Sequence, residues 1–116
     1  MNTNAPTPAE VKVLANVPVT RVLALGRWTD TALPEKRAAV MPFEARETMA
    51  LMLAGKIDQW FARSDGEGAV FLMNVTDADE AHALLEALPL GQAGMMTFEL
   101  IPIGPLWPLG LLARDG

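Results

Sequence analysis

The chain has 116 residues, a length typical of a single domain, and its 9 Lys and Arg against 14 Asp and Glu give a formal net charge of -5. This acidic balance argues against a nucleic-acid partner or an anionic membrane surface, because clusters of basic side chains supply the affinity for both. With 0 Cys and 1 His, the sequence excludes disulfides, thiolate nucleophiles, thiolate metal sites and a multi-histidine metal site within one chain.

The apolar content points to self-association. At 51% hydrophobic residues, the chain carries more apolar surface than a small monomer easily buries, so we expect a dimer or a higher oligomer. The uncharged stretch Leu100–Ala113 contains three prolines and is too short to span a membrane. The N-terminus lacks the basic and apolar segments of a signal peptide, so we expect a cytoplasmic protein with no membrane partner.

The first part of the chain divides into an arm, a strand and a helix. Residues 1–20 are expected to form a flexible N-terminal arm, and Arg21–Trp28 is a β-compatible apolar run. A helix is predicted from about Pro34 to about Ala54, capped by Asp30 or Thr31, with Pro34 in its first turn and Gly55 at its left-handed end.

The predicted helix has one apolar stripe with helical spacing, which we expect to face the core. Its members are Ala38, Met41, Ala45, Met49 and Met52. Pro42 removes the backbone hydrogen bond to Ala38, so a kink or a restart is expected there.

The second half of the chain repeats the alternation of strands and helix. Strands are predicted at Lys56–Ser64, Gly68–Val75 and Gly94–Ile103, and Asp65-Gly66 provides a hairpin turn between the first two. The sequence TDADEAHALLEALP predicts a second helix, which begins at Thr76 or Asp77 and ends at Pro89. Its buried stripe is expected to contain Ala81, Leu84, Leu85 and Leu88.

The element order is therefore β-α-β-β-α-β, which predicts an α+β, ferredoxin-like domain over residues 21–104 with an antiparallel four-stranded sheet. Both helices cover one face, and the apolar residues of the other face need a partner. We expect the apolar tail, residues 105–116, to lie at a subunit interface, with Pro105–Leu112 crossing onto a neighbour.

The succession of motifs resembles a known family. RVLALGRW, LAGKIDQWFARSDGEGAVFLMNV, DADEAHALLEALPL and MTFELIPIGPLWPL together are similar to muconolactone isomerase-like proteins of the dimeric α+β barrel superfamily, over roughly residues 21–112. The resemblance implies a dimer or a larger ring. It also implies a small-molecule enzyme that shifts a double bond in a lactone by proton transfer, with no metal and no organic cofactor.

Four residues are candidates for binding a carboxylate, stacking on a ring or transferring a proton. Arg27 and Trp28 end the first strand, where a guanidinium beside an indole could hold a carboxylate and stack a planar ring; otherwise they form a surface ion pair and a core contact. Glu44 flanks the helical stripe and, if half-buried, could serve as a general base; otherwise it is a solvated helix residue. His82 could act as an acid or base, but this position more often holds a partly exposed packing residue.

The second predicted strand supplies further candidates. Alternation places Gln59 and Arg63 on one face with Ile57 and Phe61, and Trp60 on the other. Gln59 could line a polar pocket, whereas Arg63 is favoured as a residue that closes the SDGEG turn. Glu99 in the last strand either faces water or lies in a pocket or at a subunit boundary.

These residues predict a mainly apolar cavity between the sheet and the first helix, with Met, Phe and Trp walls and Arg27, Glu44 and Gln59 as its few polar groups. The function expected is that of a cofactor-independent isomerase or lyase acting on an apolar organic acid or lactone. The alternative is a non-catalytic ligand-binding or accessory domain of the same fold, and a third hypothesis is a cofactor-independent monooxygenase.

Overall fold

The computed structural model describes residues 18–106. The expected arm therefore lies outside the described residues except for residues 18–20, and the expected tail lies outside them except for residues 105 and 106. Within this range, no helix combines the length and the apolar character needed to cross a bilayer.

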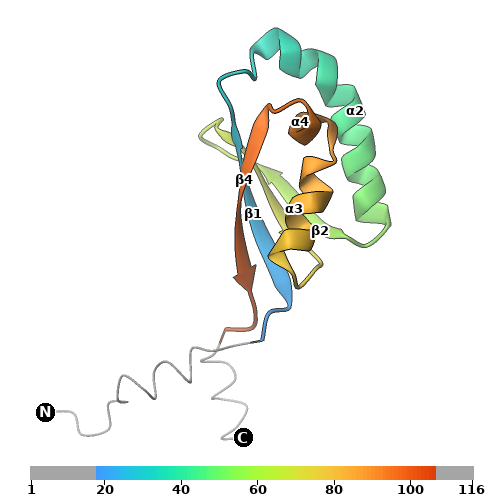
Figure 1. Cartoon of the computed structure of the whole chain (residues 1–116), viewed down its shortest axis with the longest axis vertical. Helices are drawn as coiled ribbons and strands as arrows, with labels where there is room; N and C mark the ends of the chain where they lie inside the picture. Colours follow the sequence, from blue (N-terminus) through green and yellow to red (C-terminus); the bar gives the residue numbers. More distant parts are fainter. Residues whose placement is uncertain (1–17, 107–116) are drawn as a thin grey trace, which may run out of the picture.

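The described chain folds in the predicted β-α-β-β-α-β order, with one short helix added (Figure 1). The elements are β1 (Arg21–Trp28), α2 (Pro34–Leu53), β2 (Ile57–Ala62), β3 (Gly68–Met73), α3 (Ala78–Glu86), α4 (Pro89–Gln92) and β4 (Met96–Ile103). The four strands pair in the order β2-β3-β1-β4, and every pairing is antiparallel. This confirms the predicted ferredoxin-like α+β fold.

Alternation along β1 separates the two faces of the sheet. Val22 and Ala24 are fully buried beneath the helices, whereas Leu23 and Leu25 point to the opposite face and are only half-buried. All three helices pack on the Val22 side (Figure 1), where the main core forms. The opposite face, which we call the open face, carries no helix in the described structure.

The edge strand β2 contains a bulge. Ile57 pairs with Met73, but the next paired residue is Gln59, opposite Leu72, so Asp58 is the extra residue. The bulge changes the phase of the strand, so Ile57 and Trp60 both face the helices while Gln59 faces away. The prediction that Ile57 shares a face with Gln59 is therefore wrong, because regular alternation does not continue through Asp58.

The start of α2 also differs from the prediction. Its N-cap is Leu33, which provides no side-chain cap, and Pro34 occupies the first turn as expected. Instead of capping the helix, Thr31 and Thr29 donate hydrogen bonds to the carbonyl of Gly94, at 3.1 and 2.7 Å. These bonds hold the loop before α2 against the loop that leads into β4.

The body of α2 runs without interruption through Pro42, so the helix does not restart there. Figure 1 shows the helix changing direction in its first half. It ends as predicted before Gly55, which has a positive φ of 79°.

The predicted stripe of α2 does not face the core. Every member of that stripe is exposed, and the buried residues of this helix are Glu44 and Thr48. The buried side of α2 lies less than half a turn around the helix from the apolar stripe. The stripe therefore lies along the flank of α2. The prediction about which side of α2 faces the sheet is therefore wrong.

The second helix matches its prediction more closely. Asp77 caps α3 through a 2.9 Å hydrogen bond from the backbone of Asp79, and Ala81, Leu85 and Leu88 are buried. However, α3 ends at Glu86, and Pro89 begins the separate helix α4. Proline suits this first helical position because the missing N–H has no partner there in any case.

Candidate functional site

A cavity of about 260 Å³ lies between α2, α4 and the helix-facing side of the sheet. Its buried lining residues are Glu44, Thr48, Phe71, Leu90 and Met96. The exposed lining residues mark its opening to solvent between α2 and β2, and they are Met41, Ala45, Trp60, Phe61 and Ala62. This confirms the predicted apolar cavity between the sheet and the first long helix.

Among the described residues that line this cavity, Glu44 is the charged one, and it is only 6% exposed. The backbone N–H of Leu90 donates to its Oε1 at 2.8 Å, and the hydroxyl of Thr48 donates to its Oε2 at 3.0 Å. Each carboxylate oxygen has two lone-pair sites, so each keeps acceptor capacity beyond these bonds. The arrangement satisfies a buried carboxylate without neutralising it with a cation.

The bond to Leu90 depends on the short helix α4. Its N-cap is Leu88, which cannot cap the helix with a side chain, so the first N–H groups of α4 need another acceptor. Glu44 supplies that acceptor from α2. This carboxylate therefore ties the two helices together at the same point where it lines the cavity.

Two tryptophans that the sequence singled out line the cavity. Trp28 lies at the end of β1, and the guanidinium carbon of Arg37 is 4.5 Å from the centre of its ring. Arg37 is held in place because its Nε donates to the carbonyl of Ala32 at 2.7 Å. Trp60 reaches the cavity from β2 because the bulge turns it toward α2.

Arg27 and Gln59 do not line this cavity, so that part of the cavity prediction is wrong. Both residues follow the alternation of their strands onto the open face, where Arg27 lies opposite Gly68 and Gln59 lies opposite Leu72. Arg27 instead contacts Glu67, with its Nη1 3.2 Å from Oε2.

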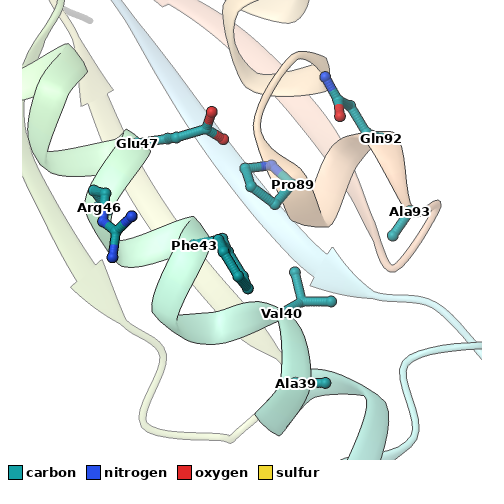
Figure 2. Close-up of a pocket in the computed structure, with 8 residues that line it drawn as sticks. All are labelled: Ala39, Val40, Phe43, Arg46, Glu47, Pro89, Gln92 and Ala93. Atoms are coloured by element: carbon teal, nitrogen blue, oxygen red, sulfur yellow. The ribbon is translucent and has the colours of Figure 1, made fainter.

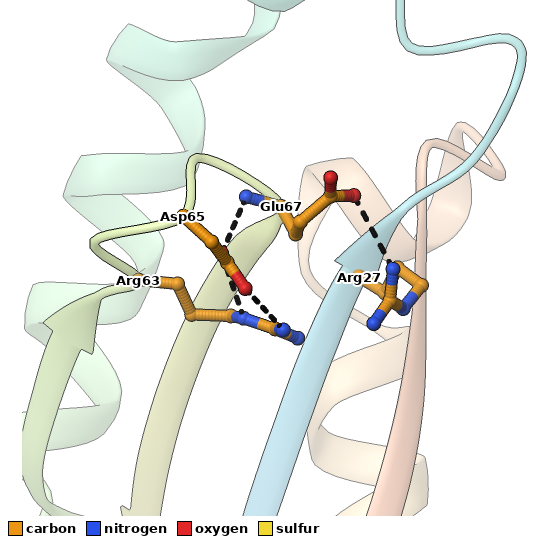
Figure 3. A network of polar contacts seen from close by, with 4 residues as sticks. All are labelled: Arg27, Arg63, Asp65 and Glu67. Atoms are coloured by element: carbon orange, nitrogen blue, oxygen red, sulfur yellow. Dashed lines mark hydrogen bonds and ion pairs between the residues drawn. The ribbon is translucent and has the colours of Figure 1, made fainter.

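The polar cluster in Figure 3 belongs to the β2–β3 hairpin. Arg63 binds Asp65 through two hydrogen bonds, of 3.2 and 2.7 Å, and Asp65 also accepts from the backbone N–H of Glu67 at 2.8 Å. The hydrogen bonds from Arg63, and then the bond from Glu67, lower the pKa of Asp65 below its usual value. The bond to Asp65 in turn raises the pKa of Arg63. These contacts agree with the turn-closing role favoured for Arg63.

The other two candidates lie away from the cavity. His82 is on an exposed side of α3, where its Nε2 is 3.4 Å from the Oε1 of Glu86. Glu99 lies opposite Leu25 on the open face and is exposed in the single chain. Neither residue shares the wall that holds Glu44.

A second hollow, of about 640 Å³, is a groove on the outer surface between α2 and α4. In Figure 2, Val40 and Phe43 of α2 face Pro89 and Ala93 across it, and Glu47 lies at its side. Although this groove is larger, it is more open to solvent, and Glu47 is exposed. We therefore take the smaller cavity, which holds the buried carboxylate, as the candidate site.

Neither a protein-family profile nor a curated protein sequence matches this chain. A solved structure does match: 5-chloro-2-hydroxyhydroquinone dehydrochlorinase (TftG) from Burkholderia phenoliruptrix AC1100, in complex with 2,5-dihydroxybenzoquinone. The match covers 72% of this chain and 93% of that chain, with a TM-score of 0.58 and 17% sequence identity. This likeness shows the fold. In fold, the chain is thus a structural neighbour of this dehydrochlorinase.

Sequence reasoning missed Thr48 and Arg37. Both lie on the same side of α2 as Glu44, since spacings of four and seven residues bring side chains to one helix face. A Glu and a Thr four residues apart, beside an apolar stripe, were a usable signal for a hydrogen-bonded pair. The contact between Arg37 and Trp28 had no such signal, because it depends on how the loop before α2 folds.

Proposed function

We propose that this protein binds a small organic molecule in the cavity between α2 and the sheet, and that it is a cofactor-independent isomerase or lyase. The ligand class expected is an apolar organic acid or lactone. The observation that carries the proposal is a carboxylate, Glu44, buried in the wall of an otherwise mainly apolar cavity. A buried carboxylate next to bound substrate is a suitable general base.

In this proposal Glu44 removes a proton from a carbon atom of the ligand. In an isomerase, the same carboxyl group returns the proton to another carbon, and the double bond moves between them. In a lyase, the electron pair of the broken C–H bond forms the new double bond, and a leaving group departs with its own electron pair. Trp28, Trp60 and Phe71 would hold a flat ligand against Glu44 by stacking.

The structural neighbour supports a small organic ligand, since it is a dehydrochlorinase solved with a quinone. The motif resemblance supports an enzyme of the muconolactone isomerase-like kind. The remaining sequence-based candidates, Arg27, Gln59, Arg63 and His82, receive no role in this mechanism, because none of them lines the cavity.

We also propose that two copies associate through their open faces. Apolar side chains of three neighbouring strands gather there, namely Leu23, Leu25, Val70, Leu72 and Ile101. Light scattering should give at least twice the 12.5 kDa mass of the chain, and Leu72→Asp should reduce that mass to the monomer value. A cytoplasmic location stays a prediction.

A second function is supported by a specific observation. Both oxygens of Glu44 already accept hydrogen bonds, from Leu90 and Thr48, so this carboxylate could serve only to join α2 to α4. The protein would then be a non-catalytic ligand-binding domain with the same cavity.

Incorporation of solvent deuterium separates the two functions. The purified protein is incubated in deuterium oxide with a panel of unsaturated organic acids, lactones and hydroxylated aromatic compounds, and exchange at carbon is followed by NMR. We expect catalysed exchange for at least one compound and a loss of about 100-fold in Glu44→Gln, the usual size of a general-base contribution.

Glu47→Gln is the matched control, since Glu47 lies on the same helix but is exposed and does not line the cavity. It should exchange at the wild-type rate. Binding of a panel member without any exchange, together with an unchanged affinity in Glu44→Gln, would favour the non-catalytic domain.

A further inference from the structure

We infer that Glu44 makes the cavity selective for charge: it accepts a neutral planar ring that donates a hydrogen bond, and it rejects a ring that carries a carboxylate. This inference rests on the proposed function, because it requires the cavity to hold a ligand. The proposed function allows both organic acids and lactones as ligands, and the charge selectivity restricts them to uncharged molecules.

The charges around the cavity disfavour a ligand that carries a carboxylate. Within residues 18–106, no Lys or Arg lines the cavity, whereas the carboxylate of Glu44 does. The guanidinium groups of Arg27 and Arg63 are paired with Glu67 and Asp65 at the hairpin. A ligand carboxylate in this cavity would therefore meet a like charge without a compensating cation, in surroundings that screen charge less well than water.

Arg37 requires separate consideration because its guanidinium stacks on Trp28, which is a wall residue. Its Nε is bound to the carbonyl of Ala32, and the side chain is not part of the cavity lining. Its contact with the cavity therefore passes through the indole ring. The structure gives it no direct position from which to hold a ligand carboxylate.

The hydrogen-bonding groups of the cavity favour a ligand that donates a hydrogen bond. Thr48 uses its hydroxyl proton on Glu44, so the pair presents acceptor sites to the cavity. A ligand O–H that donates to an ionised carboxylate makes a charge-assisted bond, which is stronger than a bond between neutral groups. Two lining residues, Trp28 and Trp60, each carry a neutral indole N–H, a donor that suits a hydroxyl or carbonyl oxygen.

The size of the cavity sets the scale of the ligand. An apolar cavity of about 150 Å³ is enough to bind benzene, so about 260 Å³ leaves room for one substituted ring. Aromatic walls favour a flat molecule over a branched one of the same volume.

The test compares three probes of similar shape at pH 7: phenol, benzoate and toluene. Phenol donates a hydrogen bond and is neutral, benzoate is an anion, and toluene has neither property. We expect calorimetry or ligand-observed NMR on the full chain to show phenol binding at least about tenfold more tightly than benzoate, with toluene between them. In Glu44→Gln the ratio of the affinity for phenol to the affinity for benzoate should fall by about tenfold, while Glu47→Gln should leave this ratio unchanged.

A second variant keeps the test informative if Glu44→Gln does not fold. Ala45 lies at the exposed mouth of the cavity, so Ala45→Lys adds a cation there without disturbing the buried bonds of Glu44. It should raise the affinity for benzoate severalfold relative to the affinity for toluene.

The outcomes separate this inference from the proposed function. If toluene binds but benzoate binds as tightly as phenol, the cavity is a ligand site and the charge selectivity is refuted. If none of the three probes binds, the cavity is not a ligand site, and the proposed function and this inference both fail.

Discussion

Helices α2 and α3 pack on the same face of one sheet, yet they bury opposite kinds of side chain. The buried residues of α3 are Ala81 and Leu85, whereas those of α2 are Glu44 and Thr48. The α3 half of the molecule closes the core. The α2 half leaves a space with a carboxylate in its wall, so the comparison separates the part that stabilises the fold from the part available for chemistry.

The difference has a physical cause in the α2 half. A buried carboxylate is tolerated only when hydrogen bonds replace its hydration, and Thr48 and the N–H of Leu90 provide them. Because Glu44 occupies the central inward position, the methionines of α2 are turned to its flank, where Met41, Met49 and Met52 stay exposed. Apolar contact between α2 and the sheet is reduced as a result.

The largest expected effect tests the α3 half. Leu85 is fully buried in the main core, so Leu85→Ala should lower the free energy of unfolding by about 2–5 kcal/mol. Met41→Ala in the α2 half should cost less than about 1 kcal/mol, because Met41 is 41% exposed. Urea unfolding of both variants gives the two values, and equal losses would show that the two halves are packed alike.

The next effect tests the polar tie in the α2 half. Glu44→Ala removes the acceptor for Leu90 N–H, so unfolding free energy should fall by about 1–3 kcal/mol. Glu47→Ala should change it by no more than about 0.5 kcal/mol, since Glu47 is exposed. Amide hydrogen exchange at Leu90 should be slow in the wild type and faster in Glu44→Ala. That difference would identify the bond from Leu90 to Glu44 as the source of the lost stability.

A smaller effect is expected where Arg37 supports the cavity wall. Arg37→Ala removes a cation–π contact with Trp28, which is worth about 0.5–1 kcal/mol, and also the bond to Ala32. The indole N–H resonance of Trp28 should shift, and ligand binding in the cavity should weaken. Leu53→Ala, at an exposed site on the same helix, should do neither; an unshifted Trp28 signal in Arg37→Ala would contradict this contact.

The smallest effect is a pH dependence at the hairpin beside the cavity mouth. The folded-state pKa of Asp65 lies below its usual value because Arg63 and the N–H of Glu67 hydrogen-bond to it. Its stabilising contribution is therefore present above the unfolded-state pKa, about 3.9, and is lost as the pH falls through the lowered folded-state pKa. The difference in urea midpoint between wild type and Asp65→Asn should shrink as the pH falls below about 4, and a constant difference would assign the effect to another group.

The order and limits of the long elements could be predicted from sequence because they depend on local patterns. The bounds of β1 were predicted to the residue, and Gly55 and Asp77 have the roles expected at helix ends. The orientation of α2 could not be predicted, since an apolar stripe competes there with two polar residues whose partners lie far along the chain. Leu90, for example, is 46 residues away from Glu44.

Only part of the lining of the cavity could be predicted, because the rest depends on contacts between distant parts of the chain. Glu44, Trp28 and Trp60 line it, but Arg27 and Gln59 do not. The residue types correctly suggested a cavity beside α2, whereas the side of the sheet that a strand residue faces depends on the register of the strand. An Arg one residue before Trp28 necessarily points the other way from it.

The bulge at Asp58 has a consequence for how this protein tolerates changes in chain length. Edge strands commonly accept insertions and deletions, because few neighbours depend on them. Here, loss of the single residue Asp58 would leave Ile57, Gln59 and Trp60 in regular alternation, each on the side of the sheet that it already occupies. Trp60 would stay beside α2 and Gln59 would stay on the open face, so the aromatic wall of the cavity should survive the loss of the extra residue.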